Sequence, residues 1–148
     1  MDIAITLSAQ APVFSLSLAD TDLATDDGLK TAVLVSLFTD RRADADDELP
    51  DPRSGDRRGC WQDQYLANTG DSLGSRLWLL KRAKQTNETI ERAKEYMREA
   101  MAWMLEDDVV TAIDVAAEWI ERGVLGLSVK GTLPDGSVFD VFQPYQVA

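Results

Sequence analysis

The chain has 148 residues, of which 45% are hydrophobic and 28% charged, and its formal net charge at pH 7 is −11. These values are typical of one soluble globular domain over residues 1–148 with a real core, and exclude a disordered chain or a membrane span. The acidic balance argues against non-specific nucleic-acid binding, because phosphates would be repelled. Since no basic segment precedes an apolar stretch at the start, we expect no signal peptide.

The residue types missing from the chain exclude several kinds of chemistry. Histidine is absent, which removes Ser-His-Asp and Cys-His nucleophile pairs and the usual pH switch. Cys60 is the single cysteine, so we expect neither zinc binding nor an internal disulfide, and the chain suits a reducing cytoplasm. We therefore predict no catalytic residues, no cofactor and no metal.

The first part of the chain alternates between apolar and polar residues. Residues Met1–Leu18 predict one or two short strands, with a break or an edge at Pro12. The polar run Asp20–Gly28 predicts a turn, in which Thr25 or Asp26 caps the element that follows.

Two contrasting segments come next. Leu29–Thr39 is mostly apolar and predicts a buried helix, although its β-branched residues would also allow a strand. Asp40–Gly55 is a charged loop with two prolines, and its acids superficially resemble calcium ligands (Asp44, Asp46, Asp47 and Glu48). The glycine and terminal glutamate of an EF-hand loop are missing. We therefore favour a loop that is solvated or paired with nearby arginines (Arg41, Arg42 and Arg53).

The segment Gly55–Lys84 holds the most distinctive residues of the chain. A glycine-punctuated loop carries Arg57, Arg58 and Trp61, and it runs into residues 75–84, which predict the start of a helix. Ser75 is the expected N-cap of that helix. Arginine and aromatic side chains are the usual anchors of interfaces. The alternative is a long loop whose tryptophans plug the edge of the core.

The clearest helix is predicted over Asn87–Leu105, with Thr86 or Asn87 as its cap. One apolar stripe recurs at helical spacing, formed by Ile90, Ala93, Met97, Ala100, Met101 and Met104. Its methionines could line a binding groove, but core filling is the favoured interpretation. Residues 76–98 hold seven basic against three acidic residues, whereas residues 99–148 hold nine acidic against two basic ones. This split suits docking to a protein neighbour, or pairing of the two parts inside the fold.

The C-terminal part predicts an antiparallel sheet. Val109–Arg122 fits a helix or a strand, and the alternation of the following residues favours a strand. Residues 124–133 and 137–142 alternate, and they are separated by the strong turn signal Pro134-Asp135-Gly136. A three-stranded meander results, and it needs a helix across one face. The predicted class is α+β, with N-terminal short strands and two to three helices packed on this meander.

Two motifs carry a resemblance to a known family. GDRRGCWQD (residues 55–63) together with GSRLWLLKRAK (residues 74–84) resembles the signature of the Mu-type baseplate wedge proteins of contractile-tailed phages and prophages. The resemblance extends to residues 29–50 and to a meander closed by LPDGS (residues 133–137), so it covers nearly the whole chain. These proteins are in turn similar to the small wedge component of other contractile tails, some members of which are called lysozymes.

The resemblance implies a structural protein of the virion tail baseplate, present in the host cytoplasm during assembly. It implies several copies that contact other wedge proteins and the first ring of the tail sheath, and edge strands that accept a partner's strand. The interface residues that it implies are Arg57, Arg58, Gly59, Trp61 and Asp63 in the first motif, and Ser75, Arg76, Leu77 and Trp78 in the second. Cys60 stands where the family commonly has tryptophan, and Glu106 is expected to survive as a buried pairing partner.

Two other functions are weighed against this one. A tail-associated cell-wall hydrolase would need a carboxylate pair, such as Glu106 with Asp107 or Asp56 with Asp63, one of them in a desolvated pocket. No local pattern singles out any such pair. A small acidic adaptor outside any phage is the third possibility.

Overall fold

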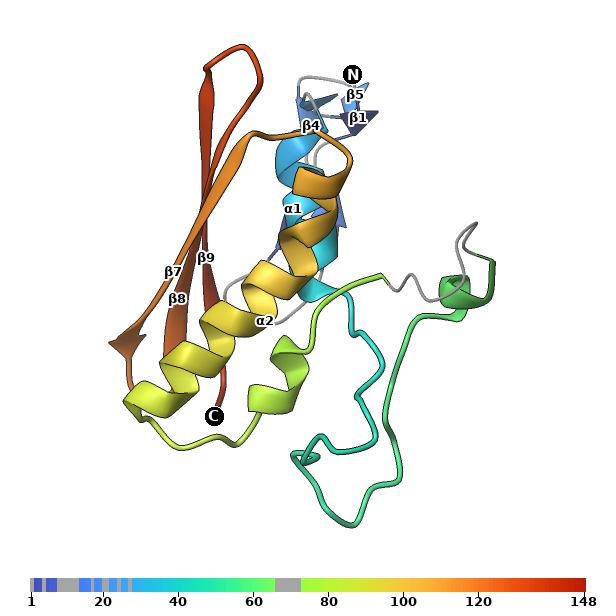
Figure 1. Cartoon of the computed structure of the whole chain (residues 1–148), viewed down its shortest axis with the longest axis vertical. Helices are drawn as coiled ribbons and strands as arrows, with labels where there is room; N and C mark the ends of the chain where they lie inside the picture. Colours follow the sequence, from blue (N-terminus) through green and yellow to red (C-terminus); the bar gives the residue numbers. More distant parts are fainter. Residues whose placement is uncertain are drawn as a thin grey trace.

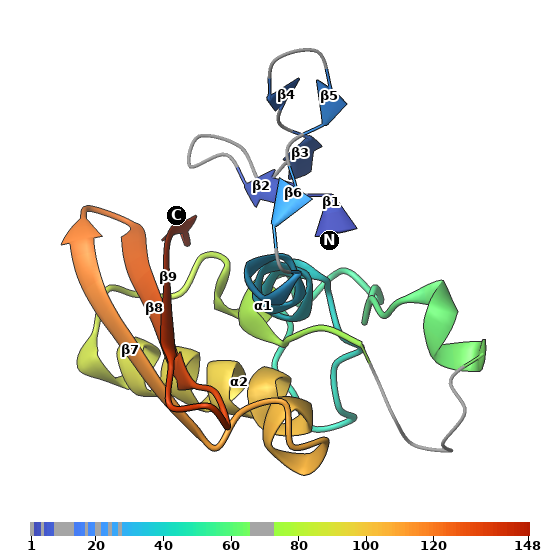
Figure 2. The ribbon, with the colours of Figure 1, turned by 90° about the horizontal axis from the view of Figure 1, so that it is seen from above.

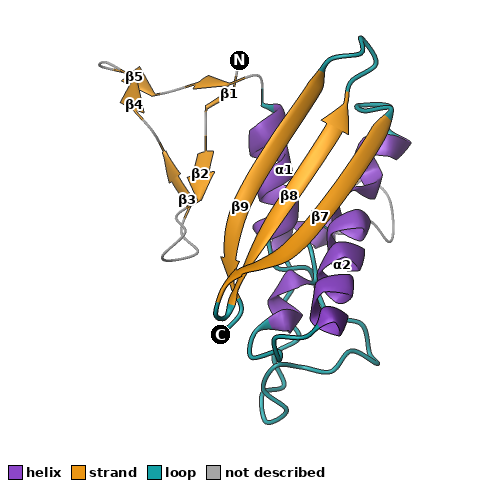
Figure 3. Cartoon of the chain, turned by 90° about the vertical axis from the view of Figure 1, so that its left-hand side faces the viewer, coloured by secondary structure: helices purple, strands orange, loops and turns teal. Residues whose placement is uncertain are grey.

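The computed structural model describes residues 2–3, 5–7, 14–16, 18–19, 22–23, 25–26, 28–65 and 73–148. These residues confirm the predicted α+β class: two α-helices lie on one face of a three-stranded antiparallel sheet at the C-terminal end of the chain (Figure 1). Figure 3 shows the other face of the sheet, which neither helix covers. Within the described ranges, no helix combines the length and the apolar character needed to cross a bilayer.

The sheet is the predicted meander. Its strands are β7 (Ala112–Glu121), β8 (Val124–Thr132) and β9 (Val138–Gln146), in that order across the sheet. The register places Val115, Val129 and Val141 side by side on the face that packs into the core. Asp114 and Glu118 are exposed, so the alternation that favoured a strand over a helix for this segment is confirmed.

The long helix α2 (Asn87–Glu106) forms as predicted. The Thr86 side chain caps it by accepting a hydrogen bond from the backbone N–H of Thr89 at 3.3 Å. The predicted stripe faces the core: Ile90 is half-buried, and Ala93, Met97, Ala100, Met101 and Met104 are buried. Full burial of each methionine contributes about 1.5–3 kcal/mol. Core filling is therefore the role of these side chains.

The shorter helix α1 (Leu29–Phe38) also confirms the helical prediction, but its start differs. The N-cap is Gly28, with φ of 82° and no side-chain cap, whereas Thr25 and Asp26 form the short strand β6 (Thr25–Asp26). The predicted caps are therefore wrong, because pairing of β6 with β1 (Asp2–Ile3) occupies that backbone. Strand pairing here overrides a local capping preference.

The N-terminal strands are short, as predicted, but four of them begin within Met1–Leu18, where one or two were expected. Within the described residues they pair with one another rather than with the meander. They are β2 (Ile5–Leu7) with β3 (Phe14–Leu16), β4 (Leu18–Ala19) with β5 (Asp22–Leu23), and β1 with β6. The expected turn over Asp20–Gly28 thus contains two strands. Pro12 lies outside the described residues.

The helix predicted from Ser75 is limited to a 3-10 turn, η2 (Leu77–Leu80). Its N-cap position is Arg76, one residue later than predicted. The Ser75 hydroxyl still acts as a cap, because it accepts a hydrogen bond from the backbone N–H of Leu77 at 3.3 Å, and it also donates to the Leu37 carbonyl. The turn ends because the backbone N–H of Arg82 donates to the Val147 carbonyl at 2.8 Å, with Arg82 at φ of 66°. A distant residue, just beyond the end of β9, therefore decides where this helix stops.

Gly74 joins this segment to the end of α1. The backbone N–H of Ser75 donates to the Thr39 carbonyl at 2.9 Å, and the N–H of Arg41 donates to the Ser75 carbonyl at 3.0 Å. Gly74 has φ of 100°, and a Cβ built on it would lie 2.8 Å from the carbonyl carbon of Thr39. Neither the backbone angle nor the space permits a side chain.

We expect Gly74→Ala to destabilise the protein by about 2–4 kcal/mol, because it adds an overlap with backbone to left-handed strain. Gly136→Ala is the matched control: φ is 86° there, but nothing lies within 4 Å of the added Cβ, so only about 1–2 kcal/mol of strain remains. Urea unfolding followed by circular dichroism measures both. Equal losses in the two variants would contradict the close approach at Thr39.

Candidate functional site

The candidate site is the loop that follows α1, together with the two predicted motifs. From Arg41 to Cys60 the backbone forms no helix or strand, and it is held mainly by arginine side chains. Figure 2 shows this loop and the 3-10 turn η1 (Trp61–Tyr65) set apart from the helices and the meander. A segment of this kind needs specific contacts to stay ordered.

Arg76 makes the largest set of these contacts. Its Nη1 lies 2.9 Å from Asp47 Oδ1 and 3.1 Å from Asp44 Oδ2, and its Nε lies 3.0 Å from Glu99 Oε2. The guanidinium also lies 4.9 Å from the ring centroid of Tyr96. One side chain thereby joins the acidic loop to η2 and α2, and its side chain is only 15% exposed.

Burial alone would lower the pKa of Arg76, but hydrogen bonds and charges from Asp47 and Glu99 outweigh burial and raise this pKa. The guanidinium therefore stays charged throughout the pH range in which the protein is folded. Glu99 is shared, since its other carboxylate oxygen lies 3.0 Å from Arg41 Nη1.

The two arginines of the first motif fold the loop back on itself. Arg57 donates from its guanidinium to the backbone carbonyls of Asp44 and Ala45. Arg58 forms an ion pair with Asp40, and its guanidinium lies 4.8 Å from the ring centroid of Trp78. Arg58 thus connects the first predicted motif to the second, and neither arginine is left pointing freely into solvent.

Gly59, Trp61 and Asp63 shape the end of the loop. Gly59 has φ of 118°, and a Cβ on it would lie 3.1 Å from the Cβ of Arg42. The Asp63 carboxylate accepts hydrogen bonds from the backbone N–H of Cys60 at 3.3 Å and of Leu73 at 3.0 Å. These contacts fix the backbone on both sides of η1.

The aromatic side chains of η1 are exposed. Trp61 is 71% exposed and Tyr65 is 76% exposed. Their ring centroids lie 6.1 Å apart with an interplanar angle of 72°, an edge-to-face pair. We call Trp61 and Tyr65 the aromatic tip. Exposed aromatic rings on an ordered loop have the character of an interface anchor.

The tryptophan of the second motif has the opposite environment. Trp78 is 3% exposed, and its Nε1 donates to the Arg41 carbonyl at 2.8 Å. Leu77 and Ser75 are buried beside it. The interpretation of the tryptophans as plugs of the core therefore holds for Trp78 and not for Trp61, which faces solvent.

Glu106 does not join this site. It is the last residue of α2 and is exposed, so the expectation that it is a buried pairing partner is wrong. The pairing expected for the acidic loop exists, but its cations are Arg76 and Arg58. Of the three expected arginines, Arg41 pairs with Glu99 of α2, and within the described ranges neither Arg42 nor Arg53 forms an ion pair. Sequence reasoning missed Asp40, Tyr96 and Glu99 as members of this site, because nothing local distinguishes them from other acids and aromatics.

Within the described ranges, no group of three or more Asp, Glu or Cys side chains is arranged to hold a metal ion. Three acids of the loop, Asp40, Asp44 and Asp47, form ion pairs with arginines instead. The fold and site therefore define a small α+β protein that holds an exposed aromatic tip on an arginine-ordered loop.

Comparison with known proteins identifies the family. The family described as "Phage protein GP46" matches residues 29–138. The chain is 50% identical over 125 residues to the "Baseplate protein gp46" of Escherichia phage Mu, covering 84% of this chain and 81% of that protein. It is 38% identical over 122 residues to the "Mu-like prophage FluMu protein gp46" of Haemophilus influenzae, covering 82% and 81%. The chain belongs to the phage protein GP46 family, which confirms the resemblance to Mu-type proteins.

We expect Arg76→Ala to lower the free energy of unfolding by about 2–3 kcal/mol, because it leaves Asp47 without its cation and removes one of the two cations of Glu99. Arg76→Lys keeps the charge but loses the forked geometry, so its loss is intermediate. Lys94→Ala, which removes an exposed pair with Glu91, is the control and leaves stability nearly unchanged. Chemical denaturation compares the three. A Lys94→Ala loss as large as that of Arg76→Ala would contradict the central role of Arg76.

Tyr145 gives this region a pH dependence. Burial of its phenol, and to a lesser extent the charge of Asp40, raises the pKa of Tyr145 above its ordinary value of 10.0, while Arg58 acts in the opposite direction. The unfolded chain therefore loses this proton first as pH rises, so stability is complete below pH 10 and falls above it.

Tyr145→Phe removes this part of the alkaline loss, which is at most about 1.4 kcal/mol per pH unit. The measurement is the free energy of unfolding between neutral and strongly alkaline pH. Tyr65→Phe, at an exposed ring, keeps the wild-type slope. An unchanged slope in Tyr145→Phe would show that other groups cause the alkaline loss.

Proposed function

We propose that this chain is a structural subunit of the tail baseplate of a contractile-tailed, Mu-like phage or prophage. The observation that carries the proposal is 50% identity, over 84% of the chain, to a protein named as a baseplate protein of phage Mu. The location that follows is the baseplate of the virion tail, reached after assembly in the host cytoplasm.

The surface supports a role in assembly. The aromatic tip is large, exposed and attached to a backbone that arginine contacts already order. Pre-ordering of this kind lowers the entropy lost on binding, which is the main cost of docking a loop. The tip would enter an apolar recess of a neighbouring subunit.

The partners in this proposal are the other wedge proteins and the first ring of the tail sheath, with several copies of the chain per baseplate. The face of the meander away from the helices supports more than one contact, since it exposes Ile120, Val138 and Phe142. Strands β7 and β9 each have one edge without a strand partner among the described residues, so either edge could accept a partner's strand.

The hydrolase alternative gains no support from the described residues. Its acid candidate Glu106 is exposed, whereas a general acid needs a desolvated site that raises its pKa. Asp63 is used in backbone hydrogen bonds that fix η1. We therefore propose a protein that works by contact and not as an enzyme.

We expect Trp61→Ala to reduce incorporation into tail particles without lowering the melting temperature, because the ring is 71% exposed and supports little of the core. Trp78→Ala is the matched control, with an expected loss of about 3–5 kcal/mol of stability. Particles are purified from a phage that carries each variant, and the chain is quantified by immunoblot.

Arg58→Ala tests whether the aromatic tip depends on the contacts that order its loop. It should reduce incorporation as Trp61→Ala does, because the loop that carries the tip loses its contacts with Asp40 and Trp78. Normal incorporation of both variants would count against the aromatic tip as an interface. Absence of the wild-type chain from tails would overturn the proposed function itself.

A further inference from the structure

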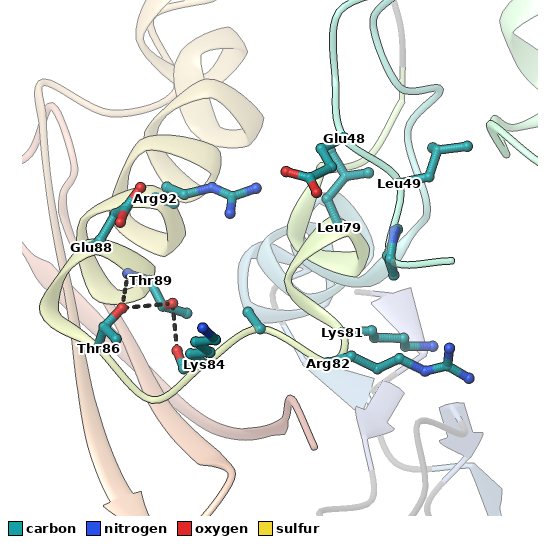
Figure 4. A pocket seen from close by; sticks show the side chains of 12 residues that line it. Glu48, Leu49, Leu79, Lys81, Arg82, Lys84, Thr86, Glu88, Thr89 and Arg92 are labelled. Atoms are coloured by element: carbon teal, nitrogen blue, oxygen red, sulfur yellow. Dashed lines mark hydrogen bonds between the residues drawn. The ribbon is translucent and has the colours of Figure 1, made fainter. Parts of the chain in front are cut away.

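A second surface feature lies away from the aromatic tip. A hollow of about 350 Å³ opens between the N-terminal end of α2, the segment that links η2 to α2, and the acidic loop near Glu48 (Figure 4). Four cationic side chains line it: Lys81, Arg82, Lys84 and Arg92. In the close view, Lys81 and Arg82 come from the linking segment and Arg92 from α2. We call this feature the basic hollow.

The cations of the basic hollow differ from the arginines that pair with carboxylates around the loop. Arg41, Arg58 and Arg76 all have carboxylate partners. Among the described residues, Lys81, Arg82 and Lys84 form no ion pair. Arg92 is directed toward Tyr96, with its guanidinium 3.2 Å from the hydroxyl and 5.8 Å from the ring centroid. On a chain of net charge −11, four cations without a carboxylate partner form a distinct attractive site.

The backbone around the basic hollow is fixed. Arg82 adopts φ of 66°, a region that costs a side-chain-bearing residue energy, and a hydrogen bond from its N–H to Val147 holds it there. Lys84 is held at the cap of α2, because its carbonyl accepts a hydrogen bond from the Thr89 hydroxyl at 2.6 Å. The positive end of the α2 dipole adds to the potential of the cations.

The other lining residues restrict what the hollow can bind. Leu49, Pro50, Leu79 and Ala83 give it an apolar wall, which a phosphate or other small anion would leave uncovered. Glu88 and Glu48 also line it, and they would repel a continuous polyanion such as nucleic acid. A ligand that matches both the cations and the apolar wall carries an apolar side chain between two separated carboxylates.

We propose that the basic hollow binds an acidic peptide segment, with an apolar residue between its carboxylates, from another subunit of the same baseplate. The proposal rests on the proposed function for the identity of its partner. Charge complementarity supports this occupant, because the lining holds four cations and only two carboxylates. The attraction is local, since the remainder of the chain repels acidic partners.

Site-specific photo-crosslinking in assembled tails tests this proposal. Ala83→p-benzoylphenylalanine places the probe on the wall of the hollow, and Gln85→p-benzoylphenylalanine places it at an exposed position beside the hollow in case the first variant fails to fold. Ala116→p-benzoylphenylalanine, on the exposed face of β7, is the control. Mass spectrometry of the irradiated tails identifies the crosslinked segment.

The expected result is a crosslink from the probe near the hollow to an Asp- or Glu-rich segment of another subunit. The probe at Ala116 lies on a face that we propose to contact other segments, so it should give no crosslink to that acidic segment. Synthesised as a peptide, that segment should bind the purified chain at least about tenfold more weakly after Lys81→Glu with Arg82→Glu. Lys130→Glu, an exposed charge on β8, should leave the affinity unchanged.

Several outcomes would overturn the proposal while leaving the proposed function intact. The first is that tails contain the probe-bearing chain but yield no crosslink near the hollow. The second is a crosslink to a neutral or basic segment or to nucleic acid. The third is that the charge-reversed variant binds the peptide as tightly as the wild-type chain does. Pyrophosphate that competes as well as the peptide itself would also overturn it, because a simple anion site would then suffice. Failure of the wild-type chain to enter tails would instead contradict the baseplate assignment.

Discussion

The arrangement of the loop after α1 depends on one cation. Arg76 contacts carboxylates from the loop and from α2, and it also lies on the ring of Tyr96, so it joins segments that share no backbone ladder. Hydrophobic burial is non-directional and could not hold this loop in one position. The forked guanidinium of Arg76 fixes the orientation of the loop, because its N–H donors must meet carboxylates at fixed angles. Arg57 and Arg58 hold the part of the loop that leads to η1 in the same way. Arg57 donates to backbone carbonyls, and Arg58 contacts Asp40 and Trp78.

The regular elements could be predicted where their signals are local. Apolar residues at helical spacing predicted α2, and Pro134-Asp135-Gly136 predicted a hairpin turn. The alternation of apolar and polar residues predicted the strands on either side of that turn. Prediction failed where distant backbone competes with local preference. Thr25 and Asp26 do not cap α1, because they pair with β1. The helix from Ser75 ends after one short turn, because Val147 takes the N–H of Arg82.

The site was predicted as a set of residues, but not as an arrangement. Arginine and tryptophan in two short motifs indicated a constrained segment, which the contacts of Arg58 with Trp78 bear out physically. The sequence could not separate the roles of Trp61 and Trp78, because exposure depends on packing far along the chain. It also could not select Asp47 and Glu99 from an abundance of acids. An interface role for these residues remains a proposal, supported by family membership and by the exposure of the aromatic tip.

Because the tryptophans have different environments, the intrinsic fluorescence of the protein reports on its state. Trp61 is 71% exposed, whereas Trp78 is 3% exposed and hydrogen-bonded inside the fold. Indole emission moves to shorter wavelength when water leaves the ring, so the signal of Trp61 responds to docking and that of Trp78 to unfolding. Trp103 and Trp119 donate hydrogen bonds to Ser36 and to the Thr86 carbonyl, and their emission adds to that of the other two tryptophans. Capture of the subunit by a growing assembly could therefore be followed in real time without any added dye.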